Sequence, residues 1–107
     1  MLFVDFDKSL PEAGPIAARV GEAGRVVSAT VLDMGEPVDL TGSSARFVAP
    51  YGESAVESPC SVEGCVASWP MPCFSEPGRF FGYVEVSKGE TVATTHDIAV
   101  AVSEGAA

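Results

Sequence analysis

The chain has 107 residues, enough for one domain with a real core and too few for two. Its formal net charge of −9 disfavours binding to nucleic-acid backbones and anionic lipid surfaces, which are themselves polyanions. No apolar run is long enough for a membrane-spanning helix, and the N-terminus lacks the pattern of a secretory signal. Glycines and prolines break the hydrophobic runs about every eight to twelve residues, a spacing that predicts an all-β sandwich or barrel.

The first half of the chain predicts four strands. Apolar residues alternate over residues 1–7, so a strand begins at the N-terminus. Residues 8–15, with two prolines and a glycine, are expected to end it and to separate an extension (1–15) from the main domain (16–102). Strands are then predicted at residues 16–20, 25–33 and 44–49, with a turn at 34–37.

The second half continues with a turn at 50–53 and two weaker strand segments over 54–66, parted near Glu63-Gly64. A short strand at 66–69 follows. Three prolines make residues 70–77 a poor strand and favour an irregular crossover, because proline lacks the N–H that a sheet ladder needs. Residues 103–107 are expected to be a flexible C-terminus.

Residues 78–102 carry the clearest pattern, two strands joined by a polar turn at 87–90. In the first strand Phe80, Val84 and Val86 share one face, which should point to the core. Phe81 and Tyr83 share the other face. They are either covered by a neighbouring loop, such as residues 70–77, or exposed as an interface.

Two further aromatic residues are candidates for contact with a partner. Trp69 is either a large core side chain or an anchor at an interface, and Tyr51 stands in a predicted turn. The predicted fold is therefore an immunoglobulin-like antiparallel β-sandwich of about seven or eight strands. Its interface candidates are Phe81, Tyr83, Trp69 and Tyr51.

Two segments of the chain, together with its C-terminal strands, resemble the N-terminal domain of phage baseplate upper proteins. The segments are residues 18–24, with the sequence ARVGEAG, and residues 31–42, with the sequence VLDMGEPVDLTG. The C-terminal part of the likeness is Gly78 before an aromatic strand, then Thr94-Thr95 and an Ile/Val strand. The likeness runs from about Ile16 to Val102 and is strongest over residues 33–42. Residues 1–15 precede it, and no stalk domain follows it.

The resemblance implies an immunoglobulin-like structural module that anchors or oligomerises host-recognition components in a phage tail or baseplate. Such a protein is made in the bacterial cytoplasm and ends in the virion. Its partners would be copies of itself and other phage structural proteins, with no nucleic acid, membrane, cofactor or metal. The resemblance implies no enzymatic activity.

The three cysteines and the single histidine, His96, permit other hypotheses. Cys60, Cys65 and Cys73 lack the tight C-x2-C knuckle of zinc sites, so buried small hydrophobes are the simpler interpretation. A Cys60–Cys65 disulfide is possible across the Gly64 turn, although an odd cysteine count favours reduced thiols. An enzyme would need a cysteine beside His96 and Asp97, which nothing in the sequence brings together.

The acidic residues suggest calcium, but no D-x-D-x-D-G loop is present. A solvated acidic surface is the simpler interpretation. The calcium candidates are Asp5, Asp7, Asp33, Glu36 and Asp39. A carbohydrate- or ligand-binding sandwich is the alternative function, and it would require Trp69, Tyr51 and Tyr83 around one open groove.

Overall fold

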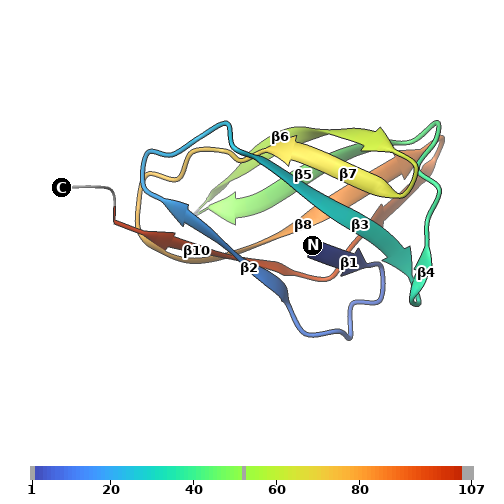
Figure 1. The fold of residues 1–107 in the computed structure, drawn as a ribbon, viewed down its shortest axis with the longest axis horizontal. Coiled ribbons are helices and arrows are strands. Elements are labelled where there is room, and N and C mark those ends of the chain that lie inside the picture. Colours follow the sequence, from blue (N-terminus) through green and yellow to red (C-terminus); the bar gives the residue numbers. More distant parts are fainter. Residues whose placement is uncertain (1, 52, 105–107) are drawn as a thin grey trace.

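Ten β-strands and no helix make up the regular structure of residues 2–51 and 53–104, the part of the chain that the computed structural model describes (Figure 1). No helix in this part is long and apolar enough to cross a bilayer. The strands are β1 (Leu2–Asp5), β2 (Ala13–Arg19), β3 (Val26–Asp33), β4 (Glu36–Pro37), β5 (Ser44–Tyr51), β6 (Ser54–Glu63), β7 (Val66–Pro70), β8 (Gly78–Lys88), β9 (Thr91–Thr94) and β10 (Ile98–Ser103).

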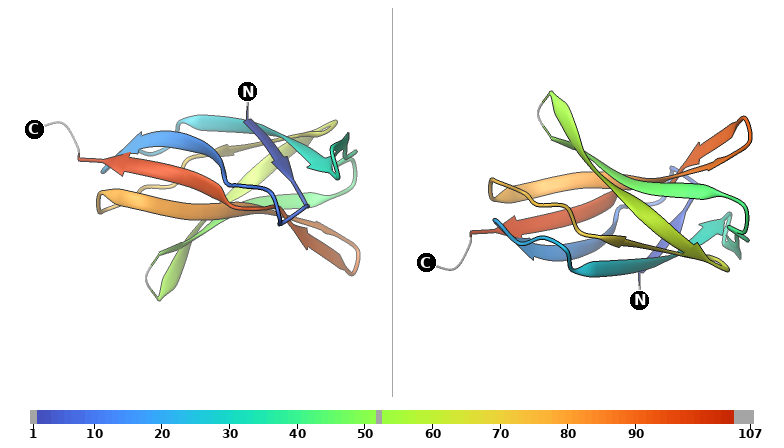
Figure 2. Two further views of the ribbon diagram at one scale, coloured as in Figure 1. Left: turned by 90° about the horizontal axis from the view of Figure 1, so that it is seen from below. Right: turned by 90° about the horizontal axis from the view of Figure 1, so that it is seen from above.

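Eight of these strands form one continuous path in the order β1-β3-β7-β6-β5-β8-β10-β2, while β4 pairs with β3 and β9 with β8. The long strand β6 pairs with β5 over residues 54–60 and with β7 over 61–63, so it carries the sheet around a corner. The sheet is therefore nearly barrel-shaped, as the views from below and above show (Figure 2). It stays open where its two end strands, β1 and β2, run in opposite directions (Figure 1).

The two end strands are attached by parallel pairing, unlike the rest of the sheet. β1 lies parallel to β3, and β2 lies parallel to β10, whereas the other pairs are antiparallel. β1 contributes Val4, which has no exposed surface, to the common core. The predicted N-terminal extension is thus partly built into the same sheet as the rest of the chain.

The core is organised around two stacked rings from opposite sides of the curled sheet. Phe47 on β5 and Trp69 on β7 lie 5.0 Å apart between ring centres and 5° from parallel. Both rings are fully buried. Gly82 on β8 makes room for them, because a Cβ at this position would lie 2.7 Å from the Phe47 ring and 2.7 Å from the Val48 carbonyl oxygen.

The strand predictions are largely confirmed, including the inward face of β8, where Gly82, Val84 and Val86 are buried. The predicted single return strand was wrong, because the chain breaks at residues 95–97. β9 pairs with the C-terminal part of β8 (residues 85–88), and β10 pairs with its N-terminal part (residues 78–82). The predicted turn at 34–37 is tighter than expected. Only Met34 and Gly35 form it, both with positive φ (51° and 85°), and β4 begins at Glu36.

Strand boundaries also differ from the predictions in β2 and β5. β2 begins at Ala13 and runs through Pro15 instead of starting at Ile16, because its early residues pair with β10. β5 extends to Tyr51, so the predicted turn at 50–53 is shorter. Residues 71–77 contain no strand, as their prolines predicted.

Candidate functional site at the seam between the first two strands

The seam is defined here as the open side of the sheet, where the edges of β1 and β2 face each other. Two adjoining hollows lie along it and share Phe3 and Ala13. The first, the His96 pocket, has a volume of about 250 Å³ and is lined by Phe3, Val4, Asp5, Leu10, Pro11, Ala13, Leu32 and His96. The second, wider and shallower, has about 480 Å³ and is lined by Leu2, Phe3, Ala13, Gly14, Pro15, Ile16 and Val27.

A bulge at Gly14 and Pro15 sets the course of β2 along the seam. Ala13 pairs with Ile98 and Ile16 with Val100, so β2 carries one residue more than β10 over this stretch. Gly14 has φ 93°, and a Cβ there would lie 2.9 Å from the Ala99 carbonyl oxygen. Only glycine fits this position without displacing the backbone.

Asp5 closes one end of the His96 pocket and ties β1 to the tight turn after β3. Its side chain is 4% exposed. Its carboxylate accepts hydrogen bonds from the backbone N–H groups of Asp7 (2.9 Å), Met34 (3.0 Å) and Gly35 (2.8 Å). The Asp7 bond, followed by those of Gly35 and Met34, lowers the pKa of Asp5.

His96 forms the base of the pocket and is 7% exposed. Its backbone N–H donates to the Asp5 carbonyl oxygen at 2.9 Å. Its ring Nδ1 lies 2.9 Å from the Pro11 carbonyl oxygen, which can only accept, so Nδ1 carries the proton and donates. Lys8 holds the adjacent rim, where its Nζ donates to the carbonyl oxygens of Thr94 (2.9 Å) and Phe6 (3.3 Å).

The rim of the seam is apolar and open to solvent. Phe3 on β1 is 55% exposed, and Leu10 in the connector to β2 is 41% exposed. Large exposed apolar side chains that gather at a hollow mark a binding or association surface. The seam is therefore the best candidate functional site in the described part of the chain.

The sequence analysis did not identify this site, and its signals were weak. Phe3 and Asp5 share one side of the alternating pattern of β1, yet Asp5 is buried and Phe3 is more than half exposed. Leu10 and Pro11 lie in the predicted connector at residues 8–15, which has no hydrophobic periodicity. Their convergence with His96, more than 80 residues later, depends on the tertiary pairing of β1 with β3 and β2 with β10.

The aromatic candidates from the sequence do not form one cluster. Trp69 is a core residue stacked on Phe47, so its ring is not available to a partner or ligand in this structure. Phe81 is 42% exposed on the outer face of β8, with the Arg79 guanidinium 5.7 Å from its ring centre. Tyr83 is half-buried on the same face. The side chain of Tyr51 lies outside the described part of the structure.

The crossover at 70–77 packs differently from the covering loop considered for Phe81 and Tyr83. Phe74 in this crossover is buried and stacks on Phe80, with ring centres 5.1 Å apart. Phe80 belongs to the inward face of β8, so the crossover closes one end of the core. Phe81 remains exposed beside it.

The cysteines are free thiols on three separate elements or loops. Burial raises the pKa of Cys60 to about 11. Cys73 Sγ is 3.9 Å from the Phe74 carbonyl oxygen, and no cysteine of the described residues is hydrogen-bonded to His96. The described residues contain no group of three or more His, Cys, Asp or Glu side chains arranged to hold a metal ion.

Two of the calcium candidates, Asp7 and Asp39, accept hydrogen bonds from residues two positions later in the chain. Asp7 accepts hydrogen bonds from Ser9, at 3.0 Å from its N–H and 2.6 Å from its hydroxyl. Asp39 accepts the Thr41 N–H at 3.0 Å. The pKa values of both carboxyls are lowered by these bonds. Such capping is the usual work of aspartate in turns.

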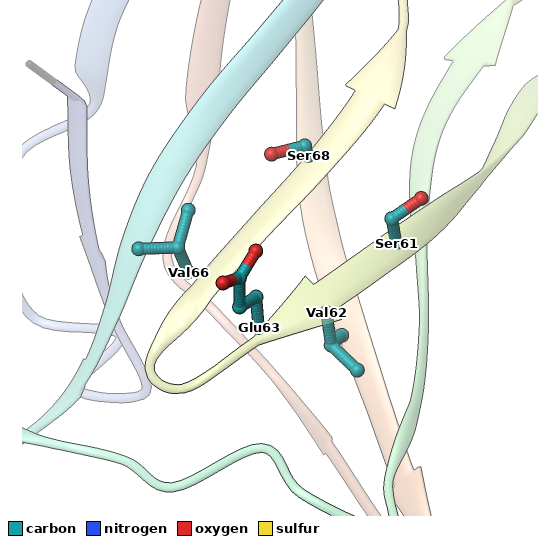
Figure 3. A pocket seen from close by; sticks show the side chains of 5 residues that line it. All are labelled: Ser61, Val62, Glu63, Val66 and Ser68. Atoms are coloured by element: carbon teal, nitrogen blue, oxygen red, sulfur yellow. The ribbon is translucent and has the colours of Figure 1, made fainter.

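A third hollow lies away from the seam, on the outer face of β6 and β7. Its volume is about 370 Å³, and Figure 3 shows Ser61, Glu63 and Ser68 among the side chains that line it. Ser68 also shares a hydrogen bond of 2.8 Å with Ser28 of the adjacent β3. This hollow is lined by small polar groups on an open face of the sheet. Within the described residues it has no buried polar side chain at its base, whereas the His96 pocket of the seam does.

Comparison with known proteins adds no relative at this point. No protein-family model matches the chain, and no curated protein sequence matches it.

Proposed function

We propose that this chain is a structural module of a phage or prophage baseplate or tail-fibre assembly. It anchors or oligomerises host-recognition components, works without catalysis or a cofactor, and is incorporated into the virion after synthesis in the bacterial cytoplasm. The observation that carries the assembly role is the apolar seam, where Phe3 and Leu10 are exposed between two sheet edges. The phage context rests on the resemblance.

The proposal includes an immunoglobulin-like fold, and the strand order supports it. In that fold two antiparallel sheets contain strands B-E-D and C-F-G. The order β3-β7-β6 on one side and β5-β8-β10 on the other has the same arrangement. Here β6 belongs to both sides through its two halves, which accounts for the barrel-like closure.

The segment with the strongest resemblance lies next to the seam. Met34 and Gly35 form its tight turn, and both donate backbone N–H groups to Asp5 at the end of the His96 pocket. Leu40, from the same segment, is fully buried. Residues 33–42, which contain this turn, therefore also hold Asp5 in place at the seam.

The partners proposed are a second copy of the chain and other virion proteins. Burying a Phe or Leu side chain stabilises an interface by about 1.5–3 kcal/mol, and each 1.4 kcal/mol corresponds to a tenfold change in affinity. Removing both apolar groups of the seam should therefore weaken self-association by about tenfold or more. Substitution of an exposed aromatic elsewhere should not.

The test is the solution mass of the full chain by light scattering over a range of concentrations. The parent is expected to form an oligomer that dissociates in the Phe3→Ser/Leu10→Ser double variant. Phe81→Ser, at an exposed aromatic on a different face, is the matched control and should leave the oligomer intact. A parent that is monomeric throughout, or an oligomer lost only with Phe81→Ser or Tyr83→Ser, would contradict assembly through the seam.

A further inference from the structure

The His96 pocket has the size of a site for a single ring. Its volume is about 250 Å³, below the roughly 300–1,000 Å³ of pockets that hold drug-sized ligands. Most of its lining is apolar and includes the side chains of Phe3, Leu10, Pro11 and Leu32. An aromatic group of modest size would bury its faces against these side chains.

The base of the pocket supplies one directional polar group. The Nδ1 proton of His96 is committed to the Pro11 carbonyl oxygen, so the neutral ring must present Nε2 as an acceptor. No hydrogen bond to Nε2 is formed within the described residues, and Nε2 is not among their fully buried polar atoms that lack a partner, so solvent reaches it. A ligand that fills the pocket displaces solvent from Nε2 and should therefore bring a donor of its own, since a polar group that is cut off from water without a partner is unfavourable.

The charges around the pocket act against an anionic ligand. Asp5 lines the pocket, and its carboxylate already accepts three backbone N–H groups, so it contributes negative potential and no donor. The chain as a whole carries a net charge of −9. A neutral donor, such as an N–H or O–H group, suits both Nε2 and this potential.

We propose that the His96 pocket binds a single aromatic group that carries a hydrogen-bond donor, as an indole or a phenol does. The ring lies between Phe3, Leu10 and Leu32, and its N–H or O–H donates to His96 Nε2. The source is either a free small molecule or a Trp or Tyr side chain presented by another protein. The pocket lies within one chain but shares Phe3 and Leu10 with the proposed assembly surface, so it is open to a ligand in the monomer and self-association would cover it.

Titration of the full chain with indole and with 1-methylindole tests the proposal, at a concentration at which light scattering shows only the monomer. Both probes fill an apolar pocket, but only indole can donate to Nε2. We expect saturable binding of indole, about fivefold tighter than that of 1-methylindole. In ¹⁵N-resolved NMR spectra the largest shifts should fall on the amides of Ala13, Leu32 and His96. Absence of saturable binding, or equal affinity for the two probes, would overturn the proposal.

A pair of variants separates the role of His96 from that of the walls. In His96→Asn the side-chain amide can still donate to Pro11, while the Nε2 acceptor is lost. The preference for indole should therefore disappear in this variant while 1-methylindole binding is retained. Leu10→Ser should weaken both probes equally and keep the preference. The amide spectrum of each variant reports whether the fold is kept, and a folded His96→Asn protein that still prefers indole would refute the role of Nε2.

N-acetyl-tryptophanamide distinguishes the two sources of the aromatic group. If the group belongs to a partner protein, the backbone amides of this probe add contacts along the edge of β1, and it should bind more tightly than indole. If the natural ligand is a free small molecule, the added groups should weaken binding. Either order is compatible with the site, provided that the preference of indole over 1-methylindole is observed.

Discussion

Two regions of the curled sheet, a closed wall and the seam, are held together in different ways. On the closed wall, defined as the strands β7, β6, β5 and β8, antiparallel ladders are continuous and the Phe47–Trp69 stack fills the space behind them. At the seam two short parallel attachments are secured by individual polar contacts, from Asp5, His96 and Lys8. The closed wall depends on volume and packing, and the seam depends on a few specific hydrogen bonds.

The difference separates stability from function in this molecule. A packed wall tolerates no added volume but needs no particular polar group. A seam held by single contacts leaves backbone edges and apolar side chains open, which is what a binding surface requires. Substitutions on the two sides should therefore differ in size and in their dependence on pH.

The largest effect is expected for Gly82→Ala in the closed wall. The new methyl group would lie 2.7 Å from both the Phe47 ring and the Val48 carbonyl oxygen. Overpacking of this kind costs about 2–3 kcal/mol, which corresponds to a Tm lower by roughly 10–20 °C for a domain of this size. Thermal unfolding measures it, with Ser87→Ala on the outer face of the same strand as control. A change of only a degree or two would show that the wall is less tightly packed than the structure indicates.

A smaller and pH-dependent effect is expected for Asp5→Asn at the seam. The hydrogen bond from the Asp7 N–H, with those from Gly35 and Met34, lowers the pKa of Asp5 from its ordinary value of 3.8. The folded state therefore binds this proton less readily than the unfolded state does. The stabilisation is present above about pH 3.8 and is lost as pH falls through the lower folded pKa.

The Asn variant should thus have a lower Tm than the parent at pH 7, and the difference should shrink as the pH is lowered below 3.8. Asp97→Asn, at an exposed aspartate beside His96, is the control for removing a charge from the same region. Chemical unfolding followed from pH 2 to pH 7 provides the measurement. A constant difference between Asp5→Asn and the parent across this range would mean that the carboxylate acts through packing alone.

The smallest effect concerns Cys60, which lies on the closed wall opposite Ala45. Burial raises the pKa of its thiol from 9.0 to about 11, so its thiolate is about a hundredfold scarcer near pH 8. The greater intrinsic nucleophilicity of a more basic thiolate offsets part of this. Alkylation by iodoacetamide should be about tenfold slower in the folded chain than in urea. Mass spectrometry of the peptides measures it, with exposed Cys73 as the internal reference, and equal rates would show that the wall opens readily.

The local pattern of the chain was sufficient for the closed wall. Alternation in β8 identified its inward face correctly, because a strand with one buried face must repeat with period two. Prolines at 72 and 77 correctly marked the irregular crossover, whereas Pro70 is the last residue of β7 and pairs with Val26. These signals are local, so they can be interpreted without knowledge of the strand neighbours.

The seam could not be predicted in the same way. Asp5 is a polar residue in a short strand, and its burial depends on the N–H groups of a turn 29 and 30 residues away. His96 becomes the base of a pocket only because the chain brings Pro11 to its ring, at a separation of 85 residues. Trp69 could equally have been an anchor or a core residue until the stacking partner Phe47 was seen.

The sequence by itself determined an all-β domain, most of its strands and the inward face of β8. These follow from hydrophobic periodicity and from the backbone limits of glycine and proline, which act over a few residues. The tertiary structure alone decided that the sheet curls through β6, that it stays open between β1 and β2, and that Asp5 and His96 meet an apolar rim there. These features depend on which distant strands pair, and on where their edges are left without a neighbour.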